Sequence, residues 1–173
     1  MRLFLLFTIC TGLLACSGAS RSSQECGFAE LSRPESTPAS WLAYSNSAFC
    51  FFGPPGIGEQ PMHSEDSFSG VFEGQDFRIV FDYGWFSDDS FEGNVALKED
   101  VVIDGRQAQF AFYEKLSTVN PTELVSAVYI PNIRLAEGDS DTALSFNVYY
   151  EDLGMKDEME QLIMSLRLSG AEW

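Results

Sequence analysis

Apolar and polar residues alternate over most of the chain beyond residue 45, which is the pattern of half-buried β-strands. The clearest alternation covers residues 77–86, where five large side chains share one face: Phe77, Ile79, Phe81, Tyr83 and Trp85. Six further short runs of apolar or alternating residues predict strands over residues 48–52, 67–73, 101–103, 107–115, 124–130 and 144–150. The stretch 53–63 is expected to be a loop, because Gly and Pro interrupt it.

Two short connections between these runs predict β-hairpins. Asp104-Gly105 lies between two strand-like runs and favours a type I′ turn, because that turn requires positive φ at both residues. Residues 74–76 form a similarly compact connection between the runs 67–73 and 77–86. The strands on either side of each connection are therefore expected to pair antiparallel.

The hydrophobic period changes from two to 3.6 near the C-terminus. Five apolar residues fall on one face of a helix at i, i+4, i+7, i+8 and i+11: Met155, Met159, Leu162, Ile163 and Leu166. We expect a helix over residues 155–168 with Leu162 and Ile163 buried, whereas Glu158 and Gln161 face water. The predicted fold class is α+β, an antiparallel β-sheet of about six to seven strands with a packed C-terminal α-helix.

Residues 1–15 have the features of a secretory signal peptide. They carry one charged side chain, and their apolar run is shorter than the roughly 20 residues that a membrane-spanning helix needs. The run ends in Leu13-Leu14-Ala15-Cys16, which resembles the lipobox of bacterial lipoproteins. The alternative is an ordinary secretory signal that is cut after Ala15 or Ala19.

The lipobox resemblance implies that Cys16 carries the lipid and that the protein contacts the membrane through this anchor. Ser17 follows in place of Asp, which favours the outer membrane over the inner membrane in a Gram-negative organism. Residues 16–25 are small and polar and are expected to form a flexible tether. Residues 26–173 are expected to form a single α+β domain in the bacterial cell envelope.

The four cysteines support an exported protein. Cys10 lies in the signal and Cys16 takes the lipid, so Cys26 and Cys50 remain in an oxidising compartment, where such a pair usually forms a disulfide. That bond would close a loop of about 25 residues and contribute roughly 3.5 kcal/mol in the chain-entropy estimate. The alternatives are two buried thiols, or a bond between one of these cysteines and another chain.

Charge and composition narrow the classes of function. The 173 residues include 26 acidic and 10 basic side chains, which give a net charge of −16. Nucleic-acid binding is not expected, because phosphate contacts need clustered Lys and Arg, and the negative field favours cationic partners. The single histidine, His63, excludes cages of several histidines, and the sequence has no Gly-x-Ser-x-Gly motif. We therefore expect no cofactor, no metal site and no catalytic residue.

Two acidic turns, residues 87–93 and 137–141, contain carboxylates of the kind that Ca²⁺ binds. Neither turn follows the twelve-residue pattern with Gly at position six and Glu at position twelve. Acidic turns that are simply solvated are the preferred interpretation, and Ca²⁺ binding stays open.

Three segments of the mature chain resemble the PsbP-like family. They are a short strand that runs into Pro54-Pro55-Gly56, the Val-x-Ile-Asp-Gly-Arg-x-Ala hairpin at residues 101–108, and the closing segment 163–168. The resemblance spans residues 45–168 and implies a sheet flanked by helices. It also implies an accessory role in a bacterial envelope or a thylakoid, and it assigns no functional residue.

These patterns together predict a lipid-anchored envelope protein of non-catalytic type, a binding or accessory module that holds a protein partner near the membrane. Two rivals stay open, a periplasmic hydrolase that uses carboxylates and a purely structural envelope lipoprotein. A concave site with two approaching carboxylates would favour the hydrolase. A flat or convex face with exposed aromatic residues would favour binding.

Overall fold

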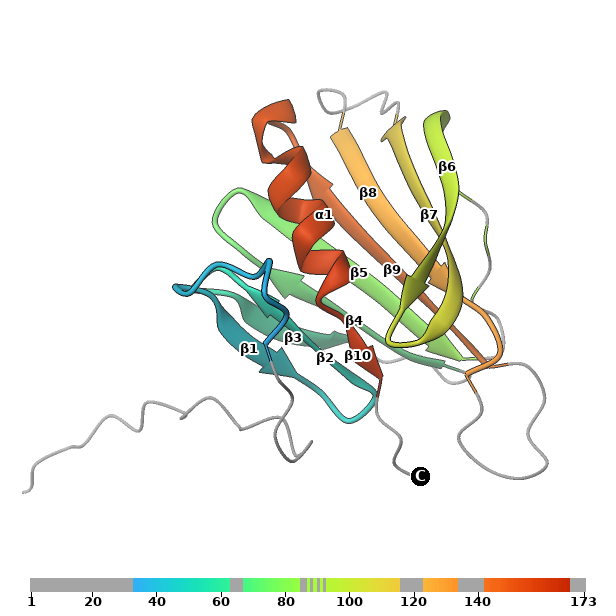
Figure 1. Cartoon of the computed structure of the whole chain (residues 1–173), viewed down its shortest axis with the longest axis horizontal. Coiled ribbons are helices and arrows are strands. Elements are labelled where there is room, and N and C mark those ends of the chain that lie inside the picture. Colours follow the sequence, from blue (N-terminus) through green and yellow to red (C-terminus); the bar gives the residue numbers. More distant parts are fainter. Residues whose placement is uncertain are drawn as a thin grey trace, which may run out of the picture.

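The computed structural model describes residues 33–62, 67–84, 87, 89, 91, 93–115, 123–133 and 142–168. Over these residues the chain is mainly antiparallel β-structure with one short C-terminal α-helix (Figure 1). The strands form a sheet of seven strands and a sheet of three strands. The helix and the smaller sheet lie on the same side of the larger sheet (Figure 1).

The large sheet has the strand order β3-β4-β5-β9-β8-β7-β6, and each neighbouring pair is antiparallel. Its strands are β3 (Gly58–Met62), β4 (Ser67–Glu73), β5 (Phe77–Gly84), β6 (Asn94–Ile103), β7 (Arg106–Lys115), β8 (Glu123–Ile130) and β9 (Ala143–Tyr150). The small sheet has the order β1-β2-β10. Its strands are β1 (Leu42–Ser45), β2 (Phe49–Gly53) and β10 (Arg167–Leu168).

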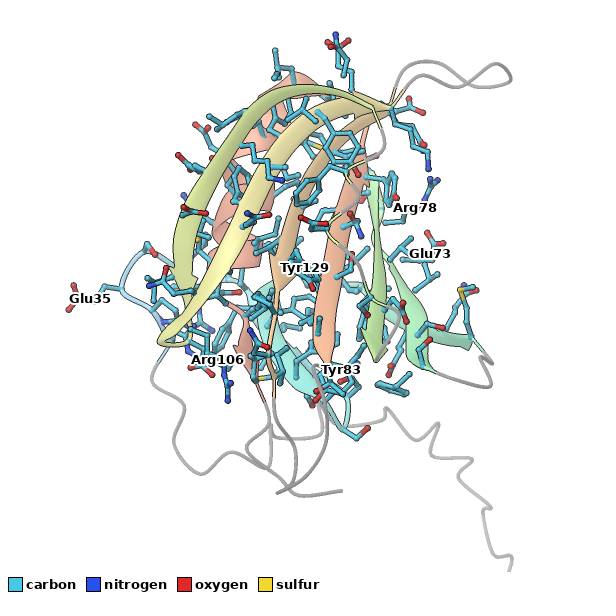
Figure 2. The ribbon with its side chains drawn as sticks, turned by 90° about the vertical axis from the view of Figure 1, so that its right-hand side faces the viewer. Glu35, Glu73, Arg78, Tyr83, Arg106 and Tyr129 are labelled. Atoms are coloured by element: carbon cyan, nitrogen blue, oxygen red, sulfur yellow. The ribbon has the colours of Figure 1, made fainter. Side chains whose placement is uncertain are left out.

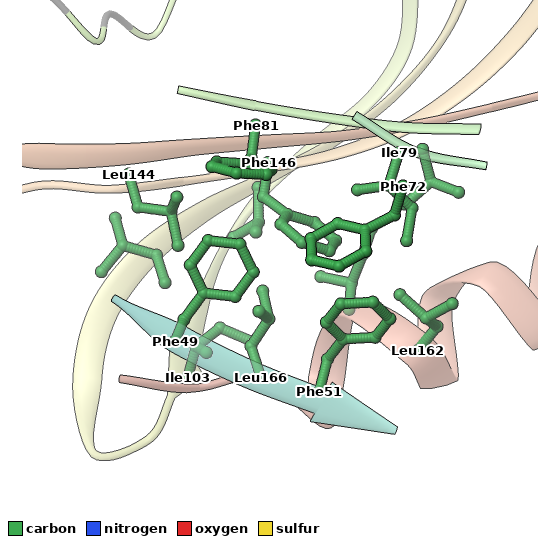
Figure 3. Packing of buried hydrophobic residues seen from close by; sticks show 14 of the residues in the cluster. Phe49, Phe51, Phe72, Ile79, Phe81, Ile103, Leu144, Phe146, Leu162 and Leu166 are labelled. Carbon is green, nitrogen blue, oxygen red and sulfur yellow. The ribbon is translucent and has the colours of Figure 1, made fainter. Parts of the chain in front are cut away.

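The hydrophobic core lies between one face of the large sheet, which we call the inner face, and the layer formed by the small sheet and the helix. Phe49 and Phe51 project from β2 towards the inner face, and both are fully buried. Their rings meet those of Phe72, Phe81 and Phe146 at centroid separations between 5.0 and 5.6 Å, mostly edge to face (Figure 3). This arrangement is the favourable one for aromatic pairs, because the ring edge is positive and the ring face negative.

The predicted apolar face of residues 77–86 is confirmed for its described members. Phe77, Ile79, Phe81 and Tyr83 are all buried on the inner face, and Trp85 lies outside the described residues. The strand predicted over residues 67–73 coincides with β4. Alternation therefore identified the central strands correctly, because each has one face in the core and one outside it.

The predicted helix is confirmed in position and in its buried face, but it is shorter than expected. After the 3₁₀ turn η1 (Leu153–Met155), α1 spans Lys156–Met164 and buries Met159, Leu162 and Ile163. Gln161 is exposed as expected, whereas Glu158 is half-buried. Residues 167–168 form β10 and pair with β2. The chain leaves the helix at Ser165, where the Phe52 N–H donates to the buried Ser165 Oγ at 2.9 Å. This contact between Ser165 and β2 lies where the helix ends, before the residue 168 at which the sequence predicted its end.

The expected loop over residues 53–63 is wrong in part, because residues 58–62 form β3. The sequence of this strand is Gly-Glu-Gln-Pro-Met, which has no alternating apolar face. In the described sheet β3 is an edge strand that pairs with β4 alone, so such a face is not needed to form it. Pro61 is compatible with such an edge, where one row of backbone N–H groups has no partner strand. The sequence also missed β1, of which three residues are half-buried, and the first seven residues of β6, which are all exposed.

The hairpin predicted at Asp104-Gly105 is confirmed. Both residues have positive φ, 50° and 75°, as a type I′ turn requires. The Asp104 side chain also connects the two sheets, because its Oδ2 accepts a hydrogen bond from the Leu168 N–H at 3.0 Å. The tip of this hairpin therefore fixes β10 as well as joining β6 to β7.

Described residues of the connection between β5 and β6 lie on the outer face of the large sheet, among them Asp89 and Phe91. In the strand order β5 and β6 are separated by β9, β8 and β7. Ser87 donates a hydrogen bond to the Asp82 carbonyl at 2.8 Å, and the Phe91 ring lies 6.1 Å from that of Tyr113. A second apolar cluster forms beneath it from Ala111, Tyr113, Val125 and Ala127. The first acidic turn predicted from the sequence, residues 87–93, therefore belongs to the connection between β5 and β6.

Replacing Leu162 with Ala should lower the free energy of unfolding by about 2 to 5 kcal/mol, because a fully buried side chain is lost and a cavity remains. The matched control is Gln161→Ala on the exposed side of the same helix, which should change stability by about 0.5 kcal/mol or less. Urea unfolding curves of both variants measure the difference. Equal stabilities would show that α1 does not stabilise the core.

Tyr83 should make the fold sensitive to alkali. Its side chain is 6% exposed, and burial raises its pKa to about 12, although a hydrogen bond with Thr142 and the charge of Arg106 lower it. Because the unfolded phenol has a pKa near 10, the neutral form stabilises the fold fully below pH 10, and this contribution is lost as the pH rises towards 12. At pH 11 the loss is about 1.4 kcal/mol.

The Tyr83→Phe variant cannot ionise at this position, so it should lack this part of the alkaline loss. Urea unfolding at pH 9 and pH 11 measures the loss in wild type and variant. If both proteins lose the same free energy over this interval, the shifted ionisation of Tyr83 is refuted.

Candidate functional site: an acidic recess at one end of the large sheet

A recess of about 720 Å³ lies at one end of the large sheet. Its walls come from the turn between β4 and β5, from the start of β8, from the end of β9 and from the segment that leads into α1. These strand ends meet because neighbouring strands are antiparallel, so the end of one lies beside the start of the next. The volume is in the range of small-molecule binding sites.

The recess is strongly acidic. Six carboxylates line it: Glu73, Asp76, Glu123, Glu151, Asp152 and Glu158. Arg78 is the one basic residue among the described lining residues. Its guanidinium is engaged with Glu123 through two contacts, Nη1 to Oε1 at 2.9 Å and Nη2 to Oε2 at 3.0 Å (Figure 2 labels Glu73 and Arg78). The described lining therefore presents five carboxylates in excess of its basic groups.

Aromatic side chains form the inner wall of the recess. The Arg78 guanidinium lies 4.5 Å from the ring centroid of Tyr149, and the Lys115 amine lies 5.4 Å from the same ring. Phe77 and Tyr150 line the recess from the inner face of the same strand ends, where both are buried. The two cations hold the Tyr149 ring in place through cation–π attraction, so the wall is preorganised.

Tyr150 is committed to a structural hydrogen bond. Its hydroxyl lies 2.8 Å from that of Ser126, and both groups are buried. Burial raises the pKa of Tyr150, the Ser126 hydrogen bond lowers it, and the charges of Glu160 and Asp157 raise it. The phenol therefore stays neutral near pH 7, and its hydroxyl serves the core rather than the recess.

The recess is suited to binding a cationic group. An acidic rim attracts a positive charge, and the aromatic wall accepts an apolar stem such as the methylenes of lysine or arginine. The described lining contains no histidine, cysteine or serine that could act as a nucleophile. Within the described residues, no group of three or more His, Cys, Asp or Glu side chains is arranged to hold a metal ion.

None of the sequence-predicted site residues that the structure describes lines this recess. Cys16, Cys26 and His63 fall outside the described residues, as do residues 137–141 of the second acidic turn. Cys50 is buried in β2, on the side away from Phe49 and Phe51, and the disulfide with Cys26 stays a prediction. Of the first acidic turn, Asp89 is described, and it lies 3.9 Å from the Lys98 amine. None of the described helices is long and apolar enough to cross a bilayer.

The sequence did not indicate the recess, because its carboxylates come from five separate positions along the chain. One feature of the sequence could have indicated the recess, namely acidic residues at the ends of several strands. Glu73 ends β4, Glu123 begins β8 and Glu151 follows β9. In an antiparallel sheet these ends meet at one side when the strands are neighbours. That condition depends on the strand order, which a single sequence does not give.

Comparison with known proteins identifies the fold. No protein-family model and no curated protein matches the sequence. Among solved structures, the chain is similar to the solution structure of cyanobacterial PsbP (CyanoP) from Synechocystis sp. PCC 6803. The TM-score is 0.52 at 13% sequence identity, and the match covers 80% of this chain and 98% of that chain.

The described domain therefore has a PsbP-like fold, mainly antiparallel β-structure with a short C-terminal helix. This agrees with the family resemblance of residues 45–168 at the level of the fold. At 13% identity the likeness concerns the fold alone, so the chemistry of this chain has to be argued from its own side chains.

Proposed function

We propose that this chain is a lipid-anchored protein of the bacterial envelope that acts by binding, with Cys16 as the lipid attachment site and the acidic recess as its docking site for a cationic segment of a partner protein. The observation that carries the proposal is the recess itself, in which five carboxylates without a matching basic group surround an aromatic wall. A flexible tether from Cys16 would keep the domain near the membrane, where such a partner would be met.

The charge of the whole chain supports a cationic partner. A net charge of −16 produces a field that accelerates the approach of positively charged partners and repels anionic ones. An Arg or Lys side chain that enters the recess would place its methylenes on Tyr149 and its charge among Glu73, Asp76 and Glu151. Affinity should therefore fall as salt screens these exposed charges.

The two rival functions predict different behaviour. A purely structural envelope lipoprotein would be indifferent to the charge of the recess. A carboxylate-dependent hydrolase would lose turnover, rather than partner binding, when the same carboxylates become amides. Charge-neutralised variants of the recess therefore separate the three proposals.

Replacing Cys16 with Ser should abolish lipid attachment and release the protein from the membrane fraction, because the thioether can form only at the cysteine sulfur. Metabolic labelling with a radioactive fatty acid, followed by fractionation of the cells, measures both effects. Cys10→Ser is the matched control, and it should be labelled like wild type. Equal labelling of the Cys16 variant would refute lipid anchoring.

Neutralising the recess should weaken the binding of a cationic segment. The triple variant Glu73→Gln, Asp76→Asn, Glu151→Gln changes exposed residues only and should fold normally. Calorimetric titration with a tetralysine peptide should show at least a tenfold loss of affinity, since three attractive charges are removed from the site.

The control variant Glu35→Gln, Glu99→Gln, Glu114→Gln removes the same net charge at exposed positions outside the recess. It should retain affinity for the peptide within about threefold, the effect expected from the long-range field alone. If both triple variants lose affinity equally, the recess is not the docking site. In solubilised membranes, a physiological partner should be retained by the control variant and lost by the recess variant.

A further inference from the structure

A second cavity lies on the outer face of the large sheet and shares no described lining residue with the acidic recess. Its volume is about 360 Å³, and it opens over β6, β7 and the end of β8. Two carboxylates, two carboxamides and a phenol line it, together with one proline: Asp89, Asp100, Gln107, Gln109, Tyr129 and Pro131. Figure 2 shows Tyr129 near the middle of the sheet.

The polar residues of this cavity begin a longer row across the sheet. The strand register places Asp100 opposite Gln109, Gln109 opposite Tyr129, and Tyr129 opposite Ser145. The row continues from Ser145 to Asp82 on β5 and Ser69 on β4. Residues that face each other across antiparallel strands point to the same side of the sheet. Six neighbouring strands therefore each contribute one hydrogen-bonding side chain to the outer face.

Two members of this row have unused hydrogen-bonding capacity. The Gln109 Oε1 and Asp82 Oδ1 atoms are buried and accept no hydrogen bond within the described part of the chain. A buried acceptor without a donor is costly, and such atoms are uncommon in native proteins. Gln109 lines the cavity, so a rotation of its side-chain amide brings this acceptor to a ligand.

The hydrogen-bonding groups that line this cavity indicate which kind of ligand fits it. Carboxylates only accept hydrogen bonds, whereas each carboxamide has two N–H donors and one acceptor, and a phenol does both. A hydroxyl group donates one hydrogen bond and accepts others, so a ligand with several hydroxyls matches the carboxylate of Asp100 and the carboxamides of Gln107 and Gln109. A cation offers donors alone and would leave the N–H groups of Gln107 and Gln109 without a partner. The apolar surfaces of Tyr129 and Pro131 match a ligand that also carries C–H groups.

We propose that this cavity binds a neutral sugar residue of a glycan. The sugar ring packs on Tyr129, and its hydroxyls exchange hydrogen bonds with Asp100, Gln107 and Gln109. A neutral sugar is favoured over an acidic one because the chain carries a net charge of −16. Lys98, the nearby cation, is already 3.9 Å from Asp89 and 5.1 Å from the Phe91 ring centroid.

The experiment uses the full chain as it is isolated from cells, in a detergent that has no sugar head group. Maltotriose, cellotriose and N-acetylchitotriose are titrated separately and followed by calorimetry and by saturation transfer to the sugar protons. At least one trisaccharide should bind. Asp100→Asn and Gln107→Ala should each weaken that binding about tenfold or more, and both residues are exposed, so both variants should fold.

Two matched controls change the same residue types at exposed positions outside the cavity, Asp157→Asn on α1 and Gln60→Ala on β3. Both should bind the sugar as wild type does, and thermal melts confirm that all four variants are folded. The proposal is overturned if none of the three sugars binds, or if the cavity variants bind as tightly as the controls.

Discussion

The insertion of Phe49 and Phe51 into the inner face of the large sheet is the interaction on which the rest of the fold depends. Both rings are fully buried and meet Phe72, Phe81 and Phe146 edge to face. Through β2 this contact also positions β1 and β10, and through the hydrogen bond of Ser165 to Phe52 it fixes the end of α1. A single strand of five residues thus holds the second layer of the domain in place.

The two faces of the large sheet differ in the side chains that they carry. The inner face supplies the core, whereas the outer face carries a row of polar side chains and a small apolar cluster beneath the connection from β5 to β6. The two edge strands have features that discourage pairing with another sheet. β3 contains Pro61, and β6 has a bulge between Val95 and Leu97 followed by charged residues.

Negative charge is concentrated at one end of the large sheet. The carboxylates of the recess outnumber its single ion pair, Arg78–Glu123, whereas the described residues Glu160 and Asp104 each have a basic partner, Lys156 and Arg167. Clustering exposed charges of one sign costs stability through repulsion, and a fold retains such a cluster most readily where a partner of opposite charge offsets the cost. The aromatic wall behind the carboxylates adds shape to this electrostatic preference.

The sequence by itself determined the central strands, the Asp104-Gly105 hairpin and the buried stripe of the closing helix. Each of these is encoded locally, by a period of two, by positive φ or by a period of 3.6. The edge strands β1 and β3, the early end of α1 and the connection between β5 and β6 were decided only in the tertiary structure. The same holds for both cavities. Their residues are distant along the chain and meet only through strand order and register, which depend on long-range packing rather than on neighbouring residues.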